Sequence, residues 1–255
     1  MRDVGQRFRA LTRLPSHIRD VARAARTFRD WPGLTACHAF GRPRDSLKFA
    51  DGSPLHLTRC PVDAQTAWAV FVKRDYDPLP RGGVVVDVGA NYGAFAVRAA
   101  RAGNRVVAVE PNSECFEALM RNARGHALGY PIEPVRAAVW NVSGKTVQIP
   151  TDPHPGNSVL RTDGATEAVR TITLDELVSG PVDYLKLDCE GAEYTIARSV
   201  RADTWAHIAT VAVEYHDGVQ DLVKILRGAG FRIVLHRRTA IWGMDYGFIR
   251  AERRP

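Results

Sequence analysis

Residues 84–93 have the sequence Val-Val-Val-Asp-Val-Gly-Ala-Asn-Tyr-Gly, which contains the strongest indication of fold class in the chain. Its consecutive valines predict a strand that is buried on both faces, as strands of parallel sheets are. Asp87 lies near the end of this strand, and Gly89 and Gly93 enclose the turn that follows. Residues 94–102 then have the apolar spacing of a helix. A strand that turns through glycines into a helix is typical of an α/β domain.

The alternation of strand and helix continues downstream. Further strands are predicted at residues 105–109, 134–139, 184–187 and 208–213, and helices at residues 113–123, 173–176, 192–200 and 219–226. Residues 140–169 are rich in turn residues and are predicted to be a loop-rich insertion. Residues 231–235 and 241–249 are predicted to form a terminal antiparallel pair. Together these elements indicate a Rossmann-like, doubly wound, mostly parallel sheet.

The first eighty residues do not follow this alternation. Residues 8–28 place apolar side chains three and four positions apart, which predicts an amphipathic helix, and Trp31-Pro32-Gly33 ends it. A hairpin is predicted at residues 47–57, where Asp-Gly separates two alternating runs. We therefore predict a helical and hairpin cap over residues 1–80 and the α/β domain over residues 81–255.

Composition and charge exclude several classes of protein. The chain has 255 residues, of which 45% are hydrophobic and 25% charged, as in ordinary globular proteins. The sequence contains no apolar run long enough for a membrane span, and its four cysteines are scattered, so we predict free thiols and a cytoplasmic location. The net charge of +7 is concentrated in arginines near the two ends. Such charges can attract nucleic acid or an acidic surface, but at termini they most often form a solvated face.

The turn after the first α/β strand and the end of the second strand predict an adenosine site. Glycines at Gly89 and Gly93 let a ligand lie against bare backbone. Glu110 ends the next strand, where a carboxylate can accept both hydroxyls of a ribose. The G-x-x-x-G spacing and the charge of Asp87 disfavour the pyrophosphate of a dinucleotide. S-adenosylmethionine has no phosphate and carries a sulfonium and an ammonium group, so an acid attracts it. The residues thus predict S-adenosylmethionine rather than NAD.

These motifs resemble the FkbM family of S-adenosylmethionine-dependent methyltransferases, over about residues 60–235. The resemblance rests on Asp87-Val-Gly-Ala-Asn-Tyr-Gly93, Glu110-Pro111-Asn112, Ala138-Val-Trp140, Gly156-Asn157-Ser158, Thr173-Leu174-Asp175, Lys186-Leu-Asp-Cys-Glu-Gly-Ala-Glu193 and Glu214-Tyr215-His216. The run Lys-x-Asp-x-Glu-Gly is the most specific of these elements. The predicted cofactor-binding residues are Asp87, Gly89, Ala90, Asn91, Gly93, Glu110, Pro111, Asn112 and Ala138.

The resemblance implies a fold, a reaction and a product. The fold would be the seven-stranded Rossmann-like sheet of class I methyltransferases. The reaction would most often be methylation of a hydroxyl on a sugar, polyketide or other secondary metabolite, with S-adenosyl-L-homocysteine as the product of the cofactor. Family members with nitrogen acceptors exist, so methylation of a small-molecule or carbamoyl nitrogen stays open.

Four polar residues follow the later strands and are candidate catalytic residues: Asp188, Glu190, Glu214 and His216. An alcohol loses its proton as it is methylated, and the ordinary pKa of an imidazole lies near working pH. We therefore predict His216 as the general base, with Asp188 or Glu190 orienting it or binding the acceptor hydroxyl. Alternatively, His216 only hydrogen-bonds a loop. The same groups could hold a hard divalent cation, but no metal ligand is predicted. Glu193 is assigned to the helix that follows.

The predicted partner is a hydroxylated small molecule, and a homodimer is compatible with the sequence. Enzymes that methylate exocyclic base nitrogens typically carry an Asn/Asp-Pro-Pro-aromatic run after the fourth strand, where this chain has Asp188-Cys189-Glu190-Gly191. A carboxylate pair there would also repel a phosphate backbone. A nucleic-acid methyltransferase is therefore the weaker alternative. The aromatic residues that could line an acceptor pocket are Trp140, Tyr215, Trp242 and Tyr246.

Overall fold

The computed structural model describes residues 17–125, 130–152, 164–216, 218–241 and 244–253. The chain divides into two compact units, Met1–Asp77 and Pro78–Pro255, which are described separately. The division lies close to residue 80, where the sequence predicts the end of the cap. Within the described residues, no helix is both long enough and apolar enough to span a membrane.

The first unit begins with helices. Residues 17–27 are helical, while residues 8–16 of the predicted first helix lie outside the described part of the chain. A second helix, α2 (Trp31–Phe40), starts where the sequence predicted only a break. The proline in its first turn is compatible with a helix start, because the N–H that proline lacks has no helical partner there. Residues 28–30 separate the two helices, and the sequence prediction missed the second of them.

A hairpin and a cluster of aromatic rings complete the first unit. Its remaining elements are β1 (Ser46–Lys48), β2 (Pro54–His56), α3 (Asp63–Ala67) and the π-helix η1 (Trp68–Lys73). The strands β1 and β2 pair antiparallel, which confirms the predicted hairpin. Phe28 stacks on Phe49 at 4.9 Å between ring centroids, and Phe71 packs edge-on against both. All three rings are buried, so this unit has an apolar core of its own.

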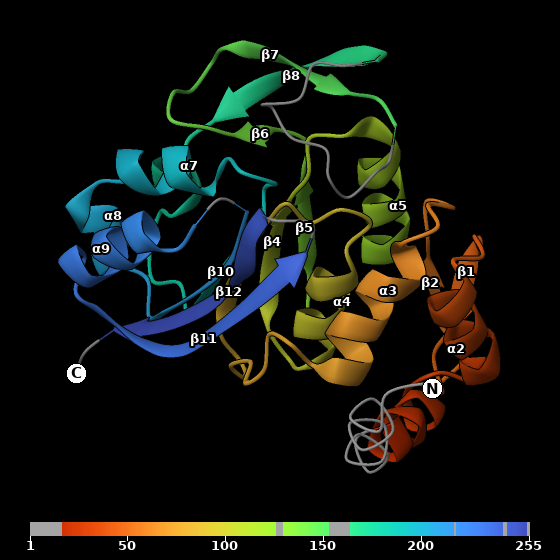
Figure 1. Cartoon of the computed structure of the whole chain (residues 1–255). Coiled ribbons are helices and arrows are strands. Elements are labelled where there is room, and N and C mark those ends of the chain that lie inside the picture. The colour runs from red at the N-terminus through yellow and green to blue at the C-terminus, as the bar shows by residue number, and fades with distance from the viewer. Residues whose placement is uncertain (1–16, 126–129, 153–163, 217, 242–243, 254–255) are drawn as a thin grey trace, which may run out of the picture. The chain divides into compact units, whose positions relative to one another are not determined.

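The second unit is built on a seven-stranded sheet with the strand order β11-β12-β10-β9-β3-β4-β5 (Figure 1). Its strands are β3 (Val84–Val88), β4 (Arg105–Val109), β5 (Ile132–Val135), β9 (Tyr184–Leu187), β10 (Thr210–Tyr215), β11 (Phe231–Ile241) and β12 (Met244–Arg253). The strands from β10 to β5 run parallel, and β12 is antiparallel to both β10 and β11. This arrangement confirms the predicted mostly parallel sheet and its terminal antiparallel pair.

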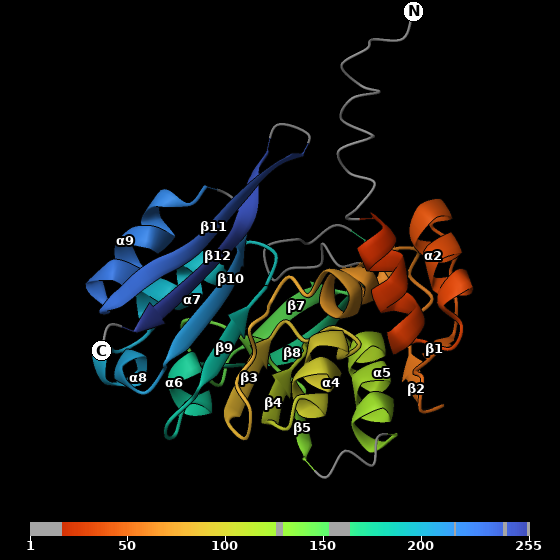
Figure 2. The same ribbon diagram turned by 90° about the horizontal axis from the view of Figure 1, so that it is seen from below.

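Helices cover both faces of this sheet. They are α4 (Ala94–Arg101), α5 (Ser113–Arg124), α6 (Leu174–Leu177), α7 (Glu193–Ser199), α8 (Ala202–Ala206) and α9 (Gln220–Gly228). Figure 2 shows α4 and α5 on one side of the sheet and α7, α8 and α9 on the other. The chain moves from β3 to β4 in one direction and from β9 to β10 in the other. Ligands bind at the carboxyl ends of the strands where such a reversal occurs, here between β3 and β9.

The sequence prediction was wrong for residues 134–172, whereas the short helix predicted directly after them is confirmed as α6. The strand predicted at residues 134–139 is divided into β5 and the short β6 (Ala138–Val139). The predicted loop-rich insertion contains β7 (Thr146–Pro150) and extends into β8 (Thr166–Ile172), and these strands form a second sheet in the order β6-β8-β7. The local sequence pattern predicted a loop because turn residues are abundant there. The strands β7 and β8 are stabilised by pairing with each other, and a local pattern does not show that pairing.

Candidate active site

The turn between β3 and α4 has a backbone that requires glycine. Gly89, Asn91 and Gly93 all have positive φ values, of 77°, 52° and 88°. A Cβ atom on Gly89 would lie 1.8 Å from the carbonyl oxygen of Asp188. The N–H groups of Gly89 and Ala90 both donate to the carbonyl of Val109, at 3.1 and 3.0 Å. The turn is therefore fixed against the ends of both β4 and β9, with its glycines presenting bare backbone.

Glu110 follows β4 and binds this turn. Its carboxyl group is buried, Oε2 accepts the N–H of Asn91 at 2.7 Å, and Oε1 accepts the N–H of Asn112 at 2.9 Å. Burial raises the pKa of Glu110 to about 7, although these two hydrogen bonds oppose the increase. A carboxylate oxygen can accept more than one hydrogen bond, so each oxygen can also accept a ribose hydroxyl.

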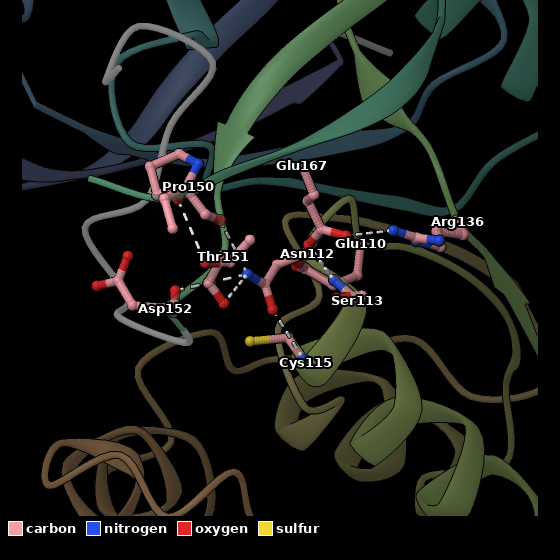
Figure 3. A network of polar contacts seen from close by, with 10 residues as sticks. Glu110, Asn112, Ser113, Cys115, Arg136, Pro150, Thr151, Asp152 and Glu167 are labelled. Carbon is pink, nitrogen blue, oxygen red and sulfur yellow. Dashed lines mark hydrogen bonds and ion pairs between the residues drawn. The ribbon is translucent and has the colours of Figure 1, made fainter. Parts of the chain in front are cut away.

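Asn112 has a structural role that the sequence did not reveal (Figure 3). It is the N-cap of α5, because its Oδ1 accepts the N–H of Cys115 at 3.0 Å. Its Nδ2 donates to the carbonyl oxygens of Pro150 and Thr151, both at 3.1 Å. The side chain of Asn112 therefore joins α5 to the end of β7. The backbone N–H of Asn112 donates to Glu110, and so it helps to hold the carboxylate that is predicted to bind the ribose.

A second contact ties the start of α5 to the small sheet. The N–H of Ser113, in the first turn of α5, donates to Oε1 of Glu167 on β8 at 2.8 Å. The other oxygen of Glu167 pairs with Arg136. Figure 3 shows Glu167 between these two partners. The small sheet thus supplies a carboxylate to a helix N-terminus, where negative charge is stabilising.

Lys186 is a buried cation that links β3 to β9. Its Nζ lies 3.2 Å from Oδ1 of Asp87 and 3.3 Å from Oδ2 of Asp188, and it donates to the carbonyl of Gly89 at 3.0 Å. Burial on its own would lower the pKa of Lys186, but the charges of Asp87 and Asp188 outweigh it and raise the pKa. Lys186 therefore stays protonated and holds the two strand ends together.

Asp87 is completely buried; its Oδ1 pairs with the ammonium of Lys186 at 3.2 Å, and its Oδ2 has no well-formed hydrogen bond to the described residues. Burial raises the pKa of Asp87, and the charge of Lys186 opposes this shift. Buried polar groups that lack hydrogen bonds are uncommon in proteins. The glycine turn, the buried acid at its start and the free lone pairs of Glu110 fit a ligand that carries a ribose and positive charge. They therefore fit the predicted S-adenosylmethionine.

The ring of His216, which directly follows β10, lies between two carboxyl groups. Its Nε2 is 3.2 Å from Oε2 of Glu190, and its Nδ1 is 3.2 Å from Oε1 of Glu193. Tyr246 on β12 packs against the same ring, with 5.3 Å between centroids. Glu193 is fully buried, and its carboxylate also accepts the backbone N–H groups of Cys189 and Gly191. The sequence prediction had assigned Glu193 only to the following helix.

His216 and Glu190 influence each other's pKa values. Burial alone would lower the pKa of His216, but the hydrogen bond to Glu193 and the charge of Glu190 raise it to about 9. Burial and then the charge of Asp188 raise the pKa of Glu190 to about 8. Because Glu190 and Nε2 of His216 lie 3.2 Å apart, the protonation of each group depends on the charge of the other.

Three side chains of this cluster could also contact a metal ion. One ligand atom from each of Asp188, Glu193 and His216 lies within 4.8 Å of the others. However, both oxygens of Glu193 already accept backbone N–H groups, and the ammonium of Lys186 already neutralises Asp188. Glu193 and Asp188 therefore already have partners of their own within the described residues.

The structure brings most of the predicted site residues to one edge of the sheet. Asp188, Glu190 and His216 lie together as expected, and the charge of Glu214 on β10 acts on both Lys186 and Glu190. Pro111 follows Glu110 directly and is half-buried. Two sequence features lie outside the described residues: the turn Gly156-Asn157-Ser158 and the side chain of Trp242.

Ala138 was predicted to contact the cofactor and Tyr215 to line the acceptor pocket. Ala138 is buried in the core of the small sheet with Ile149 and Val169, so its predicted cofactor contact stays a prediction. Tyr215 is fully buried and its hydroxyl lies 2.9 Å from Nε2 of His236. Tyr215 is therefore a core residue and does not line an acceptor pocket.

Lys186 and Glu193 are the two site residues that the sequence prediction omitted. A signal for Lys186 was present, because it is the one charged residue in the otherwise apolar run of residues 184–187. A charged residue in a strand that is buried on both faces requires a buried partner. No comparable local signal identified Glu193, since its partners come from the preceding loop and from β10.

The fold and this edge define a Rossmann-like, S-adenosylmethionine-dependent methyltransferase. The model of the FkbM methyltransferase domain matches residues 87–233, and the chain belongs to that family. The family resemblance of the sequence is thereby confirmed, together with the enzyme class and the cofactor.

Curated relatives and a solved structure agree with this assignment. The methyltransferase sdnD of Sordaria araneosa is 28% identical over 240 residues, which cover 75% of this chain and 91% of sdnD. The 31-O-demethyl-FK506 methyltransferase FkbM of Streptomyces tacrolimicus is 26% identical over 216 residues, covering 69% of this chain and 82% of that protein. The M. jannaschii tRNA m1G37 methyltransferase superposes with a TM-score of 0.51 at 12% identity, covering 83% of this chain and 58% of that one. This last similarity concerns the fold alone.

Proposed function

We propose that the enzyme methylates a hydroxyl of a small molecule, such as a sugar, a polyketide or another secondary metabolite. The observation that carries this proposal is the imidazole of His216, which two carboxyl groups hold at the edge of the sheet that also bears the glycine turn and Glu110. A hydroxyl must lose its proton as it is methylated, and an imidazole is well suited to accept it. The name of the Streptomyces tacrolimicus relative, a 31-O-demethyl-FK506 methyltransferase, supports an oxygen acceptor.

In this proposal the ends of β3 and β4 bind the cofactor. S-adenosylmethionine supplies an electrophilic methyl group on a positively charged sulfur. Glu110 accepts the ribose hydroxyls, and Asp87 attracts the positive charge of the cofactor. The remaining proposed contacts come from Gly89, Ala90, Asn91, Gly93, Pro111, Asn112 and Ala138. Asn112 acts by fixing Glu110, since its own side chain binds the end of β7.

The ends of β9 and β10 perform the proton transfer. Nε2 of neutral His216 takes the hydroxyl proton as the acceptor oxygen bonds to the methyl carbon, while the carbon–sulfur bond breaks and its electron pair stays on sulfur. In the free protein Glu190 occupies the position facing Nε2. The acceptor hydroxyl therefore replaces Glu190 at Nε2, and Glu190 is then available to bind the acceptor or receive the proton.

The charge of this region restricts the acceptor. Asp188, Glu190, Glu193 and Glu214 contribute carboxyl groups, while Lys186 and the protonated ring of His216 contribute positive charge. The excess of negative charge disfavours phosphate and carboxylate groups beside the reacting hydroxyl. It supports a neutral or cationic small molecule over nucleic acid, in line with the sequence prediction.

The test uses S-adenosylmethionine with a radiolabelled methyl group and a panel of hydroxylated sugars and polyketides. We expect His216→Gln to lower kcat with any acceptor found by roughly 10²-fold to 10⁴-fold, which is the usual contribution of a general base. Turnover of the wild-type enzyme should increase with pH up to about 9, because His216 must lose its proton to act as a base. NMR of the product separates O-methylation from the alternative N-methylation. Unchanged turnover in His216→Gln would refute the role of His216.

A further inference from the structure

The carboxylate of Glu193 connects the loop after β9 to the ring of His216. It is completely buried, at 0% exposure. Its Oε1 accepts the N–H of Cys189 at 2.6 Å and lies 3.2 Å from Nδ1 of His216. Its Oε2 accepts the N–H of Gly191 at 2.8 Å. Three nitrogen atoms therefore surround one carboxyl group, and two of them are backbone donors.

These contacts determine which ring nitrogen of His216 carries a hydrogen. As a carboxylate, Glu193 can only accept hydrogen bonds, from the two backbone N–H groups and from the ring alike. The contact between Oε1 and Nδ1 must then be an Nδ1–H donating to Oε1. In the neutral ring the lone pair is consequently on Nε2.

Glu193 also holds the turn that carries Glu190. Glu190 has a φ of 52° and Gly191 a φ of 100°, and the first of these is uncommon for a residue that is neither Gly nor Asn. The two backbone N–H groups that Glu193 binds, those of Cys189 and Gly191, lie on either side of Glu190. The same carboxylate thus fixes the conformation that aims Glu190 at Nε2.

We propose that Glu193 is a positioning residue that selects the Nδ1–H tautomer of His216 and so directs its Nε2 lone pair toward the acceptor hydroxyl. This inference rests on the proposed role of His216 as the base. Glu193 touches neither reacting atom, because its oxygens are occupied by the loop and by Nδ1. With the other tautomer, Nε2 would carry a hydrogen and could not accept the proton of the hydroxyl.

The test reads the tautomer directly, in protein labelled with ¹⁵N-histidine. Long-range ¹H–¹⁵N correlation spectra distinguish the two neutral tautomers, and the His216 signals are identified by their loss in His216→Gln. The spectra are recorded over a pH titration without acceptor. For the wild-type protein above the His216 pKa of about 9, we expect hydrogen on Nδ1.

Glu193→Gln removes the negative charge and places an amide beside Nδ1. The amide NH₂ can donate to Nδ1, so we expect the tautomer with hydrogen on Nε2 to appear. We also expect the pKa of His216 to fall by roughly one unit or more, as for the loss of an adjacent opposite charge. The matched control is Glu114→Gln, an exposed acid in the first turn of α5, which should leave the His216 spectrum unchanged.

Three outcomes are decisive. A wild-type spectrum that shows hydrogen on Nε2 in the neutral ring would overturn the proposal without any variant, even if Glu193→Gln fails to fold. A folded Glu193→Gln protein that keeps both the tautomer and the pKa of His216 would overturn it as well. If instead the tautomer changes as expected while His216→Gln retains turnover, the positioning by Glu193 stands and the proposed base role fails.

Discussion

Two regions of the same sheet edge are built in different ways. The cofactor side, at the ends of β3 and β4, consists mainly of backbone: a turn with positive φ at Gly89 and Gly93, fixed by N–H groups and by Glu110. The acceptor side, at the ends of β9 and β10, consists of charged side chains that interact with one another, among them Glu190 and His216. In the proposed function, the backbone turn holds the cofactor and the network of side chains binds the acceptor and takes its proton.

The residue that joins the two sides should show the largest effect of substitution. A Cβ on Gly89 would lie 1.8 Å from the carbonyl oxygen of Asp188, so Gly89→Ala forces β3 and β9 apart. We expect Gly89→Ala to lower the free energy of unfolding by roughly 3 kcal/mol or more and to abolish cofactor binding. The matched control is Gly144→Ala, which has a φ of 74° and no atom within 4 Å of the added Cβ.

Gly144→Ala should lower the free energy of unfolding by only about 1 kcal/mol, which is the usual cost of a left-handed backbone conformation for an L-residue. Urea denaturation of both variants provides the comparison. Equal destabilisation by the two substitutions would mean that the contact between the two sides contributes nothing to stability.

The second prediction concerns the cation between the sides. Lys186→Met leaves the carboxylates of Asp87 and Asp188 without their common partner. We expect a loss of about 3 kcal/mol in the free energy of unfolding at neutral pH, as when one member of a buried ion pair is removed. The loss should shrink as the pH falls, because burial raises the pKa of Asp87 and protonation then neutralises that acid. Denaturation curves at pH 5 and pH 8 test this, and a pH-independent loss would contradict it.

The third prediction is that cofactor binding depends on pH through Glu110, on the cofactor side. The pKa of Glu110 is raised to about 7, so the free protein holds a proton there in mildly acidic solution. Ribose hydroxyls donate to the ionised form, and cofactor binding should therefore release that proton. We expect S-adenosylhomocysteine to bind up to roughly tenfold more weakly at pH 6 than at pH 8, equivalent to about 1.4 kcal/mol. Calorimetry in two buffers of different ionisation enthalpy measures the release, and its absence would contradict this role of Glu110.

The difference between the two sides also explains what the sequence could predict. The stretch from Val84 to Gly93 contains its own strand and the turn that leads into α4, so the local pattern predicted this strand, turn and helix correctly. Lys186 lies 97 residues from the Gly89 carbonyl that it binds, and only the folded chain shows that contact. Glu193, at the start of α7, likewise contacts His216, which lies 23 residues further along the chain, directly after β10. The prediction for residues 140–169 was wrong for the same reason, because β7 and β8 are stabilised by pairing with each other.

The most direct test of the division between the two sides is calorimetric titration with S-adenosylhomocysteine of Glu110→Ala and His216→Gln. We expect Glu110→Ala to weaken binding by roughly tenfold to 100-fold, as for the loss of hydrogen bonds to a charged group. We expect His216→Gln to bind within about twofold of the wild-type protein, because its contacts lie on the acceptor side. Equal losses in the two variants, or a loss in His216→Gln alone, would contradict the division of the site into a cofactor side and an acceptor side.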